Sequence, residues 1–183
     1  MQKTGWILFW ALLAAVCVAP SVVRADDAAD AMAANMPPRE RELIDTLLAA
    51  RKSFQTSHSL SPAKDARIDM QIRVISYMRQ SQVATDWIGT VKSRGITPEG
   101  NAWVSIEIAD GITVSTWQTE RDDQDSATMF RPHAKLFAPA QAAKIAAPII
   151  FSGTILKSVL ANDEEMVMHP QFIARFSALK PAQ

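Results

Sequence analysis

Alternating apolar and polar positions dominate the middle of the chain. Apolar or small residues occupy every second position from Trp87 to Val91 and again from Val104 to Ile108, and the segment 95–100 between them is rich in turn-forming residues. A period of two predicts two β-strands, each with one buried face, joined by a short loop. We expect the rest of the domain to close around this hairpin.

Three further strands and one helix follow from the same pattern. The Asp110–Gly111 dipeptide predicts a tight turn into a third strand, and two later apolar runs predict a fourth and a fifth. The expected bounds are 112–119, 149–156 and 172–177 for these strands and 134–146 for a helix bent or restarted at Pro139, with loops at 120–126 and 157–169. This order of elements is that of a five-stranded OB barrel.

The alternation also predicts which side chains point inward. Gly153 lies in the middle of the fourth strand, where a glycine indicates a tight bend or the close approach of another backbone. The neighbours that share its face are expected to point into the barrel together with residues of the second and third strands; the set is Ile149, Phe151, Ile155, Val104, Ile106 and Val114.

The segment before the strands has the apolar spacing of α-helices. A first amphipathic helix, residues 39–54, has Leu43 and Leu47 on its apolar face and follows Pro37–Pro38. A second helix begins near Ser61–Pro62, and we expect its core-facing stripe to be Ile68, Ile72, Ile75 and Met78. The predicted fold class is therefore α+β, a five-stranded OB-like β-barrel with two N-terminal helices. The helical hairpin occupies residues 37–80 and the barrel domain residues 81–180.

The N-terminal segment has the pattern of an export signal. Lys3 precedes an apolar run from Trp6 to Ala19, which is short for a membrane span, and cleavage is expected between Ala25 and Asp26. Residues 1–25 are then a signal peptide and residues 26–36 a flexible tether. We expect a periplasmic or secreted protein with no stable membrane span after cleavage. The alternative is a lipoprotein acylated at Cys17, although Val16 is large for the position before such a cysteine.

Charge and cysteine content narrow the range of partners. The chain has 19 basic and 19 acidic residues, and residues 1–25 contain two of the basic ones and no acidic one, so their removal leaves a net charge of −2. Such a balance disfavours general nucleic-acid binding. Cys17 is the single cysteine, so a cleaved chain has no disulfide and no thiol chemistry.

Five short segments resemble a known family. They are Trp87-Ile88-Gly89-x-Val91, Val104 to Ala109, Thr116-Trp117, Phe151-Ser152-Gly153 and Pro170-x-Phe172-Ile173-x-Arg175-Phe176. In this order, over roughly residues 42–180, they resemble a family of small uncharacterised bacterial and phage proteins with an OB-like domain and preceding helices. The resemblance implies the barrel fold and no catalytic residues. The chain departs from the family pattern at Ala146-Ala147-Pro148, where a polar turn is expected, and at the start of the helix near His133.

Two tryptophans suggest a binding surface. Alternation places Trp103 and Trp117 on the outer face of the second and third strands, where OB barrels stack ligands. Together with Glu107 and Arg175 they form the candidate ligand-binding set. The alternative is that the tryptophans pack beneath the N-terminal helices, and that Arg175 forms an ion pair with Glu107 or Asp110 at the barrel edge.

Other candidate ligands and polar groups lack the spacing that known metal and catalytic sites require. Met166, Met168 and His169 could bind a soft metal ion, but no other residues have the spacing of further ligands. The acidic residues Asp122, Asp123 and Asp125 do not match a calcium loop. His58, His133 and His169 are scattered, and Ser152 does not lie in a nucleophile elbow. We therefore expect no metal, no cofactor and no enzymatic activity.

These expectations combine into one functional interpretation. The chain is predicted to be an exported, non-enzymatic binding or accessory module that contacts an unknown protein or small ligand in the cell envelope. The alternative is a structural or docking factor of an envelope or secretion assembly, in which the helices provide the docking surface.

Overall fold

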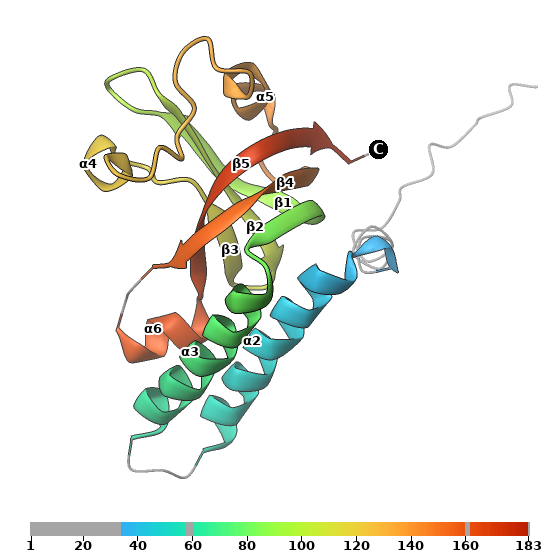
Figure 1. Ribbon diagram of the computed structural model, residues 1–183, viewed down its shortest axis with the longest axis vertical. Helices are drawn as coiled ribbons and strands as arrows, with labels where there is room; N and C mark the ends of the chain where they lie inside the picture. Colours follow the sequence, from blue (N-terminus) through green and yellow to red (C-terminus); the bar gives the residue numbers. More distant parts are fainter. Residues whose placement is uncertain (1–33, 58–60, 160–161, 183) are drawn as a thin grey trace, which may run out of the picture.

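The computed structural model describes residues 34–57, 61–159 and 162–182 and shows a β-barrel standing on a helical hairpin (Figure 1). The predicted signal peptide, its cleavage site and His58 lie outside these residues. The strands are β1 Val83–Ile96, β2 Ala102–Ala109, β3 Ile112–Ser115, β4 Pro148–Ser158 and β5 Gln171–Pro181. They close in the order β1-β2-β3-β5-β4, with β3 and β5 parallel and the other pairs antiparallel. The predicted α+β fold with an OB-like barrel is confirmed.

The helices differ in part from the expected pattern. They are α2 Pro38–Thr56, α3 Pro62–Gln80, α4 Glu120–Asp123, α5 Phe137–Ala142 and α6 Asp163–Met168. The loops expected at 120–126 and 157–169 each contain a short helix, because Thr119 and Asn162 act as N-caps and accept backbone N–H groups through their side chains. Helix α5 is shorter than predicted and lies at the end of the barrel farthest from the hairpin (Figure 1).

The barrel interior agrees with the predicted alternation. Val104, Ile106 and Val114 are fully buried. Phe151 lies between two other rings, with edge-to-face contacts at 6.0 Å to Trp87 and 5.4 Å to Phe176. Ile149 and Ile155 are buried on the same side, so the inward set is confirmed.

Gly153 occupies a point of close backbone approach. A Cβ atom there would lie 2.5 Å from the Arg175 carbonyl oxygen and 2.9 Å from the Phe176 Cα. The register between β4 and β5 shifts at this position. The prediction that a mid-strand glycine admits a neighbouring backbone is therefore confirmed, and the contact lets the two strands cross tightly where the barrel curves.

The hairpin packs through a different face of α3 than expected. Helix α2 buries Leu43 and Leu47 as predicted. Helix α3 buries Ala66, Met70, Val74 and Tyr77, whereas Ile68, Ile72 and Ile75 are 41%, 60% and 51% exposed. The predicted core-facing stripe was wrong for these three isoleucines, because α3 is apolar on two faces and periodicity does not indicate which of them meets the core. Met78, the fourth residue of that stripe, is partly buried against the core.

Glu40 of α2 joins the hairpin to the barrel, and its neighbour Arg39 joins α2 to α3. Both carboxyl oxygens of Glu40 accept the N–H of Ile88, at 3.1 and 3.0 Å, in the part of β1 that pairs with β4 and not with β2. Burial raises the pKa of Glu40 to about 8, although this hydrogen bond opposes the shift. Arg39 stacks 4.0 Å from the centre of the Tyr77 ring and donates to the Tyr77 and Ser81 carbonyl oxygens.

The segment just before α2 also contributes to the core. Met36, the last residue of the predicted tether, is partly buried against the hydrophobic core.

None of the helices in the described part of the chain combines the length and apolar character needed to cross a bilayer.

Candidate functional site

The four residues predicted to bind a ligand separate into two groups. Trp103 and Glu107 lie on β2. Trp103 covers Gly95 of β1, where a Cβ atom would come within 2.7 Å of the indole. Glu107 accepts a hydrogen bond from Lys92 Nζ at 3.2 Å and another from the Gly111 N–H at 3.2 Å. Both side chains are therefore engaged by neighbouring elements.

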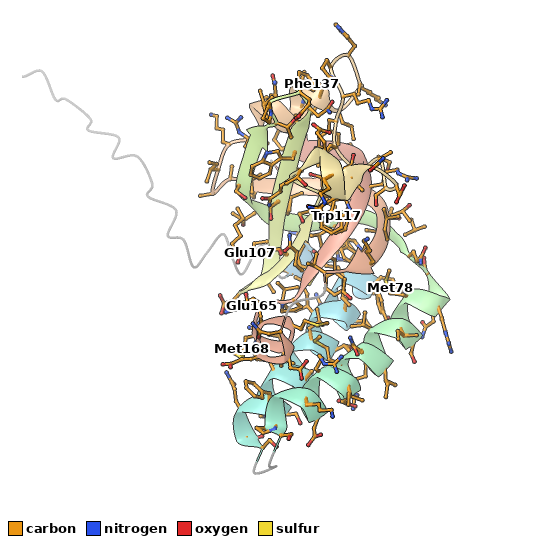
Figure 2. The ribbon with its side chains drawn as sticks, turned by 90° about the vertical axis from the view of Figure 1, so that its left-hand side faces the viewer. Met78, Glu107, Trp117, Phe137, Glu165 and Met168 are labelled. Atoms are coloured by element: carbon orange, nitrogen blue, oxygen red, sulfur yellow. The ribbon has the colours of Figure 1, made fainter. Side chains whose placement is uncertain are left out.

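Trp117 and Arg175 form the second group. The Trp117 indole N–H donates to Ser126 Oγ at 3.3 Å, and Arg175 donates to the Ser126 carbonyl oxygen. Lys157 Nζ lies 4.9 Å from the centre of the Trp117 ring, in a cation–π arrangement. Figure 2 shows Trp117 and Glu107 at different heights on the barrel. The predicted ion pair of Arg175 with Glu107 or Asp110 was wrong, because Arg175 reaches the loop after α4 instead.

The small polar residues that flank the two tryptophans along β2 and β3 are buried. Ser105, Thr113 and Ser115 are 5%, 8% and 0% exposed, and Gln171 Nε2 donates to Ser115 Oγ at 2.9 Å. Trp103 and Trp117 are themselves half-buried. The hairpin packs against α6 and β1, so the tryptophans owe their burial to neighbouring strands and the α4 loop.

Several of the residues weighed for metal or catalytic roles have structural partners. Asp123 accepts the Thr128 N–H and hydroxyl, and Ser152 Oγ accepts the Asp86 N–H at 2.9 Å. Met166 is buried, and the Met168 carbonyl oxygen accepts from Arg51. Within the described ranges, no three His, Cys, Asp or Glu side chains are grouped to hold a metal ion.

The structure contains a cavity that the sequence did not indicate. A space of about 470 Å³ lies at the end of the barrel covered by α5, where β1, β4 and β5 meet. Its wall is almost entirely apolar, and its two charged residues are Lys144 and Lys180. The lining residues are Val91, Pro139, Ala142, Ala143, Lys144, Ala147, Pro148, Ile149, Leu179, Lys180 and Pro181. We call this space the α5 cavity.

Small side chains explain why the α5 cavity stays open. The segment 138–148 consists mainly of alanine and proline, which cannot fill the space at a barrel end as leucine or phenylalanine would. Val91 holds the segment in place, because its N–H donates to the Ala147 carbonyl oxygen and its carbonyl oxygen accepts the Ala146 N–H. Ala146 adopts a positive φ of 61° there. The sequence offered one signal for this cavity. It was a run of small residues at the place where the family resemblance predicts a polar turn.

The lining of the α5 cavity has a narrow range of chemical groups. None of its described lining residues has a carboxyl, imidazole, thiol or hydroxyl group, so the wall offers aliphatic contact and two amines. Its volume is in the range of small-molecule sites. No family model, curated protein or solved structure matches this chain.

Proposed function

We propose that the protein is an exported, non-enzymatic binding module and that the α5 cavity holds its ligand. The observation that supports this proposal is an apolar space of about 470 Å³ with Lys144 and Lys180 as its charged residues. An apolar wall favours an aliphatic or flat hydrocarbon group, and an amine favours an acidic group at one end of it. The ligand class is therefore an amphipathic acid of small size.

The experiment compares an acid with a neutral molecule of the same chain length. We expect dodecanoate to bind the purified protein more tightly than dodecanol in isothermal titration calorimetry. Replacement of both Lys144 and Lys180 by Ala should weaken dodecanoate binding about tenfold and leave dodecanol binding unchanged. Filling the space with Ala143→Phe should weaken both ligands.

A matched control uses an alanine outside the cavity. Ala178 lies on β5 and is half-buried but does not line the cavity, so Ala178→Ser should bind both ligands like the unchanged protein. Saturable binding that Ala143→Phe does not affect would place the ligand elsewhere. Absence of saturable binding by either ligand would contradict the proposal.

Export is tested separately. We expect the exported protein to begin at Asp26, as intact-mass measurement of material from the envelope or medium would show. An acylated species that begins at Cys17 would place the protein on a membrane surface instead.

We also expect no retention on a single-stranded oligonucleotide column at physiological salt, since the cleaved chain has a net charge of −2.

A further inference from the structure

Helix α3 has an apolar stripe that the fold leaves uncovered. Ile68, Ile72 and Ile75 are spaced by four and three residues and therefore lie on one face of the helix. Their exposed fractions are 41%, 60% and 51%. Single exposed apolar residues are common in soluble proteins, whereas a contiguous row of this kind is typical of an interaction surface.

A groove runs beside this stripe, between α3 and the barrel. A hollow of about 210 Å³ has Val74, Ile75 and Phe172 among its lining residues, and a second hollow of about 380 Å³ shares these three. Met78, at the end of α3 that leads to the barrel (Figure 2), lines the second hollow together with Leu156. The stripe and the hollows adjoin at Ile75, which belongs to both, and we call this combined apolar surface the α3 groove.

Cations border the α3 groove at both ends. Lys64 lies one helical turn before Ile68, Arg79 lies one turn after Ile75, and Lys157 lines the groove from β4. Among the residues that the structure describes, neither Lys64 nor Arg79 forms an ion pair. Their charges are therefore available to a partner.

The acidic side chains of α3 and the nearest one of α6 are already engaged. Asp69 pairs with Arg73 at 2.9 Å, and Asp163 of α6 pairs with Arg67 at 2.6 Å. Asp65 also has a partner within the protein. Of the four cations of α3 (Lys64, Arg67, Arg73 and Arg79), Lys64 and Arg79 are thus the two that lie outside the ion pairs of the described residues.

We propose that the α3 groove binds an amphipathic helix of a partner protein, in which acidic residues border the apolar stripe. An elongated apolar groove along a helix is the shape that helix-in-groove recognition uses. Acidic borders would meet Lys64 and Arg79. This surface is separate from the α5 cavity, and the inference does not depend on ligand binding there.

Charge and shape disfavour two other occupants. In a two-fold dimer through α3, parallel helices would bring Lys64 against Lys64 and antiparallel helices would bring Lys64 against Arg79, and both arrangements repel. An anionic bilayer is usually recognised by a cluster of about four to eight cations. Two cations outside ion pairs, Lys64 and Arg79, beside an apolar stripe suit a peptide better.

The test uses two designed helical peptides of about 18 residues, long enough for helix formation not to be marginal. They share one leucine stripe and differ only in the bordering residues, which are glutamate in one and lysine in the other. By fluorescence anisotropy, we expect the glutamate peptide to bind about tenfold more tightly at low salt, with a difference that shrinks as salt is added.

Variants of the protein locate the binding surface. Ile72→Ser and Ile68→Ser should each weaken the glutamate peptide about tenfold, and both should fold because these side chains are exposed. Ile96→Ser is the matched control, since Ile96 is 55% exposed but lies on β1, outside both the stripe of α3 and the two hollows. A double change of Lys64 and Arg79 to Glu should reverse the preference between the two peptides.

Four results would overturn the proposal. One is that neither peptide binds. A second is that Ile72→Ser and Ile68→Ser bind the peptides like the unchanged protein. Another is a concentration-dependent dimer in sedimentation that Ile72→Ser abolishes, which would assign the surface to a second copy. The last is binding to vesicles of mixed zwitterionic and anionic phospholipid that Ile72→Ser abolishes, which would assign it to a membrane.

Discussion

The barrel and helix α3 place the same amino acid in opposite environments. Ile106, Ile112 and Ile155 of the barrel are at most 1% exposed, whereas Ile68, Ile72 and Ile75 of α3 are 41–60% exposed. A closed barrel has an interior that receives one face of every strand. A helix in a two-helix hairpin has neighbours on one side only, so a second apolar face remains in solvent. An apolar pattern thus identifies an element more reliably than it identifies what the element packs against.

The largest expected effect is in the barrel. Phe151→Ala should lower the free energy of unfolding by about 3–5 kcal/mol, because it removes a buried ring and leaves a cavity. Phe151 is 1% exposed and contacts the rings of Trp87 and Phe176. Urea denaturation midpoints provide the measurement. A loss below about 1 kcal/mol would mean that the barrel interior is not packed as described.

An identical substitution in the two regions sharpens the comparison directly. Ile155→Ala should cost about 2–5 kcal/mol, because Ile155 is 1% exposed. Ile72→Ala should change stability by about 0.5 kcal/mol or less, because Ile72 is 60% exposed. Both variants are measured by the same urea titration. Equal losses would show that α3 buries the stripe that the structure exposes.

Glu40, which joins helix α2 of the hairpin to the barrel, should make stability depend on pH. Burial raises its pKa from 4.5 to about 8, so the folded protein retains a proton that the unfolded chain releases between these values. Stability from this group is fully present below about pH 4.5 and is lost as the pH rises through about 8. The expected decrease is on the order of a few kcal/mol.

Glu40→Gln is the control for this pH effect. Its amide oxygen can still accept the Ile88 N–H, but the side chain cannot ionise. We expect the variant to lose the decrease in stability between pH 5 and 8 that urea titrations of the unchanged protein should show. A rise in stability over that range, or the same slope in both proteins, would contradict the assignment.

A smaller loss than in the barrel interior is expected on the outer face of β4. Ser152→Ala removes the acceptor of the Asp86 N–H, at a position where Asp86 has a positive φ of 50°. A loss of about 0.5–1.5 kcal/mol is expected for one hydrogen bond at a half-exposed site. Thermal unfolding of Ser152→Ala beside Phe151→Ala would rank the two faces of the strand. A larger loss for Ser152→Ala would reverse the contrast between inner and outer positions.

Local patterns predicted the barrel because each strand has one meaningful face. Alternation around Val104 and Val114 indicated correctly which side chains enter the core, and Gly153 indicated a close backbone approach. The bounds of β3 were less predictable. The strand ends at Ser115 because the Trp117 N–H donates to the Thr128 hydroxyl, a partner eleven residues away in sequence.

The functional surfaces were harder to predict from sequence. The α5 cavity exists because the small side chains of Ala142 and Ala143 leave space at the end of the barrel. Such an unfilled space has no periodic pattern in the sequence. The position of Arg175 depended on a loop that folds into a helix capped by Thr119. On α3, Met70 and Tyr77 lie on one apolar face and the isoleucines on another. The packing of the hairpin buries the first face, and the sequence pattern alone does not distinguish the two.

The position of α5 at the end of the barrel farthest from the hairpin (Figure 1) has a thermodynamic consequence. A helix bound in the α3 groove would not cover the α5 cavity, so the two occupants would not compete and could form a ternary complex. If the barrel keeps the same shape with either occupant, the coupling free energy between the two sites is near zero. Titration of dodecanoate with and without the glutamate peptide should then give equal dissociation constants, and a large difference would show that the barrel transmits binding from one end to the other.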